Sequence, residues 1–130
     1  MKLKQLVPIV FIVLFSFQFL FSQSNSEISK AIAAGSAKEL AKHFNENIDL
    51  KIPGTDGVFN KMQAELILKD FFIQNPIESY EVKHEGKSKN EAHYSIGELI
   101  LSSNRYRTYI LIKKQENAYR IIEFNIELDE

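Results

Sequence analysis

The chain has 130 residues, with 16 basic and 17 acidic side chains and no cysteine. The lack of cysteine excludes disulfide bonds, thiolate metal sites, thiol catalysis and lipid attachment to an amino-terminal cysteine. The near balance of charges gives no electrostatic footprint for binding nucleic acid or an anionic membrane.

The amino terminus has the pattern of a secretory signal peptide. Two lysines precede an apolar run from Leu6 to Phe21, and polar residues follow it. The run is shorter than the roughly 20 residues that span a bilayer, and a retained anchor is the alternative. Cleavage after Ser22 predicts a signal peptide at 1–22 and a mature domain at 23–130. Without the two lysines the mature domain has 14 basic and 17 acidic residues, a formal charge of −3, and we expect it in the periplasm or secreted.

Two short amphipathic helices are predicted next. Ser24 with Glu27, and Ser36 with Glu39, have the spacing of capping boxes, and each pair precedes apolar residues at helical spacing. Gly35 lies between the two segments and is a typical helix terminator. Each helix has one apolar face, so both should lie on a sheet.

A strand and a turn follow the second helix, which is predicted to reach Phe44. Apolar and polar residues alternate over 48–52, which predicts a strand. The composition of 53–57 predicts a tight turn. A brief returning strand is expected at 58–59.

A third helix is predicted from Lys61 to Ile73, with Asn60 as its cap and Pro76 beyond its end. Its apolar side chains should make it the most deeply packed helix. The predicted face consists of Ala64, Ile67, Leu68 and Phe71, broadened by Leu66 and Phe72.

The carboxyl-terminal part predicts a meander of antiparallel strands over 92–101, 106–114 and 119–128, preceded by a strand over 80–85. A three-residue turn at 115–117 would set Ile112 opposite Arg120 and Ile110 opposite Ile122. The expected core face is then Tyr106, Thr108, Ile110, Ile112, Ile122, Phe124 and Ile126.

The turn near Asn104 leaves the position of Glu98 open. A three-residue turn would put Glu98 in the core beside Thr108, and a two-residue turn would put it on the opposite face beside Tyr109. The shorter turn is favoured because it does not bury an unpaired carboxylate.

The opposite face of the meander is mixed, with cations and aromatic rings interleaved in the manner of protein interfaces. We predict a binding site there, formed by Tyr94, Glu98, Arg107 and Tyr109. A solvated face of no further function is the plain alternative. The third interpretation is a homodimer through the sheet, over a patch of Ile96, Ile100, Leu111 and Ile121.

The order of elements predicts an α+β fold in which a curved antiparallel sheet carries three helices on one face. Residues 48–54, 56–59, 68–72, 83–86 and 94–97 resemble those of an uncharacterised bacterial family of small exported proteins. That family has the cone-shaped nuclear-transport-factor-two-like (NTF2-like, or cystatin-like) fold. The resemblance implies the fold and a single domain, and it implies no activity.

The sequence favours a non-catalytic binding domain that holds a small apolar ligand or a protein partner. The alternative is a small isomerase or hydrolase that uses Glu98 with Tyr94 or Tyr109 inside the cone. A structural role in an envelope complex is the third hypothesis. No cofactor or metal is expected, because the three histidines have no metal-ligand spacing, and no membrane contact is expected after signal cleavage.

Overall fold

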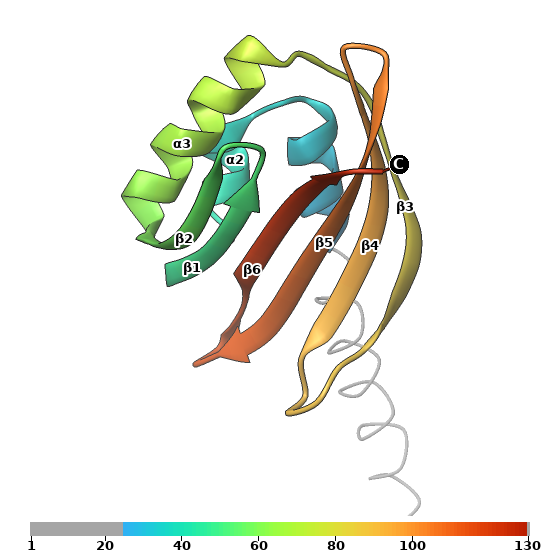
Figure 1. The fold of residues 1–130 in the computed structure, drawn as a ribbon. Helices are drawn as coiled ribbons and strands as arrows, with labels where there is room; N and C mark the ends of the chain where they lie inside the picture. Colours follow the sequence, from blue (N-terminus) through green and yellow to red (C-terminus); the bar gives the residue numbers. More distant parts are fainter. Residues whose placement is uncertain (1–24, 130) are drawn as a thin grey trace, which may run out of the picture.

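A six-stranded sheet with helices on one face forms the protein, as the computed structural model of residues 25–129 shows (Figure 1). The predicted α+β fold is therefore confirmed. The predicted signal peptide and Ser24 lie outside the described residues. In chain order the elements are a helical segment over 25–33, α2 (Ala37–Ala41), β1 (Phe44–Ile52), β2 (Thr55–Asn60), α3 (Lys61–Gln74), β3 (Ile77–Lys87), β4 (His93–Leu101), β5 (Asn104–Gln115) and β6 (Ala118–Leu128).

The sheet order is β2-β1-β6-β5-β4-β3, so the first and last strands of the chain are neighbours. β1 runs parallel to β6, and the other neighbouring strands are antiparallel. The predicted meander corresponds to β3 through β6. The parallel pair joins this meander to the β1–β2 hairpin, and so produces one continuous curved sheet (Figure 1).

The two amino-terminal helical segments follow the predicted signals. Gly35 has a φ of +65°, the left-handed conformation that ends a helix, and the Ser36 side chain accepts a hydrogen bond from Glu39 N at 3.2 Å. The prediction that the second helix extends to Phe44 was wrong. Phe44 begins β1, because it pairs with Ile121 of β6 and its ring is buried in the core.

α3 has the predicted cap and a narrower core face than expected. Asn60 Oδ1 accepts from Gln63 N at 2.8 Å and Gln63 Oε1 accepts from Asn60 N at 3.2 Å, a complete capping box. Ala64, Leu68 and Phe72 are buried, with Ile67 and Phe71 packed beside them. Leu66 is 59% exposed, contrary to prediction, because it projects from the other side of the helix. Within 25–129, no helix is long and apolar enough to cross a bilayer.

The hairpin turns differ in register from the predictions. Ser102 and Ser103 form a two-residue turn with φ values of 48° and 66°, so Glu98 pairs with Arg107 instead of Tyr109. Glu98 nevertheless lies on the mixed face, as the shorter turn predicted. At the next hairpin Gln115 pairs with Ala118, which makes that turn one residue shorter than predicted.

A β-bulge in β6 compensates for the shorter turn. Ile112 pairs with Ile121 and Leu111 pairs with Glu123, so Ile122 is an extra residue between them. The prediction that Ile122 lies in the core and Ile121 on the mixed face was wrong, because Ile121 is fully buried. Beyond the bulge the expected faces return, and Phe124 packs in the core opposite Ile110.

The core fills the space between the sheet and the helices. Phe44, Leu99 and Phe124 are at most 1% exposed, and Phe72 of α3 is 6% exposed. All the buried core side chains belong to residues 28–126, so the described part of the chain contains a complete hydrophobic core.

Candidate functional site

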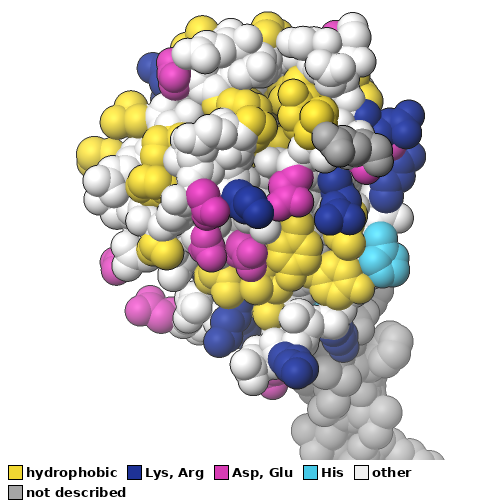
Figure 2. Space-filling model, viewed as in Figure 1, with side chains coloured by type: hydrophobic (Ala, Val, Ile, Leu, Met, Phe, Trp, Pro, Cys, Tyr) yellow, Lys and Arg dark blue, Asp and Glu magenta, His cyan; other side chains and the backbone are white. Residues whose placement is uncertain are grey.

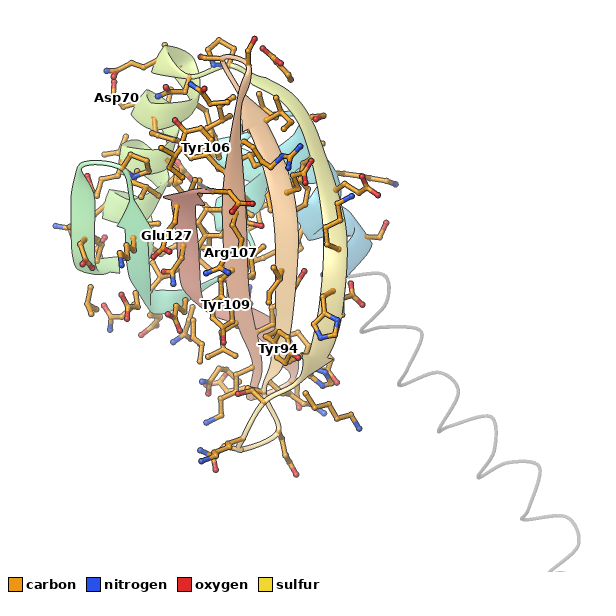
Figure 3. The ribbon with its side chains drawn as sticks, turned by 45° about the vertical axis from the view of Figure 1, so that its right-hand side comes forward. Asp70, Tyr94, Tyr106, Arg107, Tyr109 and Glu127 are labelled. Atoms are coloured by element: carbon orange, nitrogen blue, oxygen red, sulfur yellow. The ribbon has the colours of Figure 1, made fainter. Side chains whose placement is uncertain are left out.

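The four predicted binding residues lie together on the sheet face that points away from the helices, which we call the outer face. Its side chains alternate along each strand with core side chains such as Leu99 and Ile110. Figure 3 shows Tyr94, Tyr109, Arg107 and Glu127 along this face. The outer face of β4, β5, β6 and β1 consists of Tyr94, Ile96, Glu98, Ile100, Arg105, Arg107, Tyr109, Leu111, Glu123, Asn125, Glu127, Asp49 and Lys51.

Opposite charges alternate across neighbouring strands of the outer face. Arg107 of β5 pairs in register with Glu98 of β4 and with Glu127 of β6. Lys51 of β1 contacts Glu127 at 3.0 Å, and Arg105 lies 3.6 Å from Glu98. The hydrogen bond and charge of Lys51 lower the pKa of Glu127, and Glu127 in turn raises the pKa of Lys51. Most charges here are thus neutralised by neighbours on the same face.

Aromatic rings line the part of the outer face next to these charges. The rings of Tyr94 and Tyr109 stack with centroids 6.3 Å apart and an angle of 15°, and His84 Nε2 lies 3.1 Å from the Tyr94 hydroxyl. Burial, followed by the charge of Glu123, raises the pKa of Tyr109. Tyr94 also covers Gly86 of β3, where a Cβ would lie 2.5 Å from the tyrosine oxygen. The Tyr94 ring therefore lies directly over the backbone of β3 at Gly86.

A groove of about 360 Å³ runs between the charges and the rings. Two of the predicted residues, Arg107 and Tyr109, line it. Figure 2 shows hydrophobic side chains flanked by acidic and basic ones on this face. The full lining is Ile96, Arg107, Tyr109, Glu123, Asn125 and Glu127.

Sequence reasoning missed Lys51 as a member of this site. Its place beside Glu127 depends on the parallel pairing of β1 with β6, in which Lys51 lies opposite Asn125. Strands so distant in the chain give no local signal of their pairing. Asn125 Nδ2 donates a hydrogen bond to Glu123 Oε1 at 3.1 Å, and both side chains line the groove.

The predicted acid-base site inside the cone does not form. Glu98, Tyr94 and Tyr109 lie on the outer face, because their positions in β4 and β5 alternate with the core residues. Phe72 and Phe124 occupy the interior instead. Catalysis by a carboxylate in an apolar cone therefore has no support from these three residues.

The interior does contain three hydroxyl groups that sequence reasoning missed. Tyr80 lies over Gly97, beside Ser95 and Thr108, and burial raises its pKa against the smaller opposing effect of the two neighbouring hydroxyls. The three hydroxyls are near one another, yet within the described chain none makes a hydrogen bond of regular geometry. The available signal was a tyrosine in the strand that precedes the one containing Gly97, since aromatic residues often cover strand glycines.

A cavity of about 170 Å³ lies at the end of the cone near Ser95. Asn25 and Glu85 stand at its edge, where Asn25 Nδ2 donates to Glu85 Oε1 at 2.5 Å. Its volume is below the roughly 300 Å³ at which ligand pockets for drug-sized molecules begin. The cavity is thus smaller than a drug-sized apolar ligand would need.

The described residues contain no cluster of three or more histidine or acidic side chains suited to a metal. His43 is partly buried, and its Nε2 lies 3.7 Å from Glu27 Oε2. Burial lowers the pKa of His43, and Glu27 opposes that effect.

Comparison with solved structures identifies relatives over nearly the whole described chain. A protein from Bacteroides ovatus is 28% identical, with a TM-score of 0.73 over 80% of this chain and 94% of that chain. One from Bacteroides uniformis is 27% identical, with a TM-score of 0.75 over 81% of this chain and 96% of that one. Both are described as members of the DUF4783 family. A search of curated proteins finds no match.

A more distant structure places the fold in a wider group. A ketosteroid isomerase-like protein from Erwinia carotovora atroseptica is 10% identical, with a TM-score of 0.71 over 85% of this chain and 95% of that chain. Other neighbours are described as cystatin-like or NTF2-like, so the predicted fold group is confirmed. The model of the family called domain of unknown function DUF4783 matches residues 25–127, and the chain belongs to this family.

Proposed function

We propose that this protein is an exported, non-catalytic binding domain that holds a protein partner on its outer face. The single observation that carries the proposal is the groove between Arg107 and Tyr109, where the Tyr109 ring, stacked on Tyr94, meets charges of both signs. Tyrosine and arginine are the residues that most often anchor protein partners. The export pattern of the first 22 residues supports a location in the periplasm or outside the cell.

The interior supports a protein partner over a small apolar ligand. Phe44, Phe72 and Phe124 fill the cone, and the cavity near Ser95 has a volume of about 170 Å³. A hydrophobic ligand of drug size would have to displace these side chains. The outer face needs no such rearrangement.

Site-specific photo-cross-linking tests the proposal. A photo-reactive phenylalanine analogue replaces Tyr109 in one strain and Leu66 in another, each protein being produced in its source organism. Leu66 is the matched position because it is 59% exposed on α3, away from the outer face. We expect a protein adduct at position 109 and none at 66. The absence of any adduct at 109 would overturn the proposal.

Native mass spectrometry provides the second arm of the test. The purified mature chain is mixed with a lipid and metabolite extract and then desalted. We expect no bound small molecule, since the core is filled. A small molecule retained by the wild type and lost on enlarging Ser95 to leucine would favour a ligand in the cone over this proposal.

One observation favours a second candidate, a structural component of an envelope complex. Met62, Leu66 and Ile73 of α3 are 75%, 59% and 68% exposed and share one helical side, and Val58 of β2 is 71% exposed. α3 therefore has apolar residues on two sides, of which only one packs on the core. An adduct at position 66 without one at 109 would support this candidate instead.

A further inference from the structure

A second groove, of about 710 Å³, lies between the start of β1 and the tip of the β5–β6 hairpin. We call it the end groove, and Asn45, Asn47, Gln115 and Asn117 are among the residues that line it. It shares no lining residue with the groove beside Tyr109. The two grooves are therefore separate sites.

The end groove forms where β1 separates from β6. Phe44 pairs with Ile121, and the next pair is Asp49 with Glu123, so four residues of β1 (45–48) face a single residue of β6. In the part of the chain that the structure describes, the first two of these four residues have no partner in β2 either. A strand that leaves its neighbours in this way leaves room for another segment of chain beside it.

Four carboxamide side chains surround the end groove. Asn45 and Asn47 belong to β1, and Gln115 and Asn117 belong to the hairpin. None of these four side chains makes a hydrogen bond to another residue within 25–129. A carboxamide carries a donor and an acceptor side by side, the same pair that each peptide group presents. The groove is therefore suited to bind the main chain of a partner segment.

The spacing of two of these amides matches an extended peptide. Asn45 and Asn47 are two residues apart in β1, so they point to the same side of the strand, roughly 6.7 Å from each other. An extended segment repeats its own main-chain groups on one side over the same distance. A segment that lies alongside β1 thus meets both amides with equivalent peptide groups.

The charges around the end groove favour an uncharged segment. Lys61 and Arg120 are matched in number by Glu46 and Glu116. Arg120 Nη1 also donates a hydrogen bond to Lys42 O at 2.8 Å, which occupies part of its guanidinium group. A groove without net charge has no strong attraction for a highly acidic or highly basic partner.

The end groove is less suited to an oligosaccharide. Sugar rings pack their C–H faces on exposed aromatic rings, whose faces are rich in electrons. Phe44 is the aromatic residue in the lining, and it is 1% exposed with its ring in the core. A peptide main chain needs no such platform, since hydrogen bonds hold it.

We propose that the end groove binds an extended, uncharged segment of a partner protein, with Asn45 and Asn47 hydrogen-bonded to its main chain. The site is additional to the partner site at Tyr109 and does not depend on it. Binding through the main chain gives affinity with only a weak preference for the sequence of the segment.

Phage display of random dodecapeptides tests the proposal on the chain from residue 23 onward, since the complete core lies in residues 28–126. Peptides selected on the wild type are counter-selected on the double variant Asn45→Ala/Asn47→Ala, and an enriched peptide is synthesised for fluorescence anisotropy. The double variant should weaken its binding by about 10-fold or more, the effect of two lost hydrogen bonds. Asn104→Ala is the matched control, because this exposed asparagine lies at the opposite end of β5, and it should leave the affinity unchanged. Circular dichroism verifies that both variants are folded.

Methylation of main-chain nitrogens in the same peptide isolates the main-chain contacts. Alternate nitrogens of an extended peptide point in opposite directions, so only one of the two alternate sets should face the amides. Methylation of that set should weaken binding by about 10-fold or more, and methylation of the other set should not.

Three results would overturn the proposal. The first is that no peptide is enriched after counter-selection. The second is that an enriched peptide binds the folded double variant, or both methylated forms, as tightly as the unmodified peptide binds the wild type. The third is a glycan array in which a sugar binds the wild type and not the double variant, which would assign the groove to a glycan instead.

Discussion

The packing of Tyr80 on Gly97 makes a stringent test of the closed interior. In Gly97→Ala the new Cβ would lie 2.6 Å from Tyr80 Cε1 and 2.8 Å from Thr108 Oγ1. Thr108 is fully buried and its strand continues on both sides, so neither neighbour can move away without disturbing β5 or the core. Alanine is normally the better residue at such a position because it restricts the unfolded chain. Here we expect alanine to lower the free energy of unfolding.

The magnitude follows from two opposing effects. Overpacking a filled core costs about 1–3 kcal/mol, and the gain from replacing glycine by alanine is about 0.4–1 kcal/mol. The free energy of unfolding should therefore fall by about 1–2 kcal/mol for Gly97→Ala. Gly57→Ala is the control, because its Cβ would meet the Phe59 ring at 3.4 Å, an ordinary contact distance. That variant should be neutral or slightly more stable.

Urea unfolding followed by circular dichroism measures both variants. With a slope of about 1–2 kcal/mol per molar urea, the midpoint for Gly97→Ala should fall by about 1 M. Adding Tyr80→Leu should remove most of the clash, so the two substitutions should couple by about 1 kcal/mol. A Gly97→Ala variant as stable as Gly57→Ala would refute the reasoning and indicate free space inside the cone.

Three further predictions concern local interactions. Burial lowers the pKa of His43, so the stability that the neutral imidazole contributes is present above about pH 6.5 and is lost as the pH falls through the folded pKa. The melting temperature should therefore decline less between neutral and mildly acidic pH in His43→Gln than in the wild type. Equal declines would contradict this prediction. Asn60→Ala removes the side-chain bond to Gln63 N and should cost about 1 kcal/mol in urea unfolding, whereas no loss would show the cap to be dispensable. Lys51→Met should raise the pKa of Glu127, measured by carbon-detected NMR titration of its carboxyl group. An unchanged pKa would mean that the Lys51–Glu127 ion pair does not persist in solution.

The elements themselves were largely predictable because their signals are local. Alternating apolar residues identified the strands, and Asn60 with Gln63 defined the start of α3. The end of the second helix was misjudged, since Phe44 fits the apolar face of a helix and the first inward position of β1 equally well. Only its pairing with Ile121 of β6 decides between them.

The turns were less predictable because their residues are atypical. Ser102 and Ser103 both adopt positive φ, a conformation for which glycine and asparagine are the usual choices. Asn104 therefore attracted the turn prediction, yet it begins β5. In β6 the bulge at Ile122 exchanges the expected roles of two adjacent isoleucines, which no alternation pattern can reveal.

The candidate site was predictable in its residues and less so in its surroundings. Parity along β4 and β5 was enough to bring Tyr94, Glu98, Arg107 and Tyr109 to one face. Lys51 reaches that face through a parallel pairing between distant strands. Whether those predicted residues bind a partner stays a prediction that the tests above address.

Hydroxyl-radical footprinting in intact cells tests the outer-face account most directly. Tyr109 lies at the centre of the outer face, and Met62, 75% exposed on α3, is the internal reference. The modification rate of Tyr109, relative to Met62, should be several-fold lower in cells than in the purified protein at low concentration. An equal relative rate in the two samples would contradict the account.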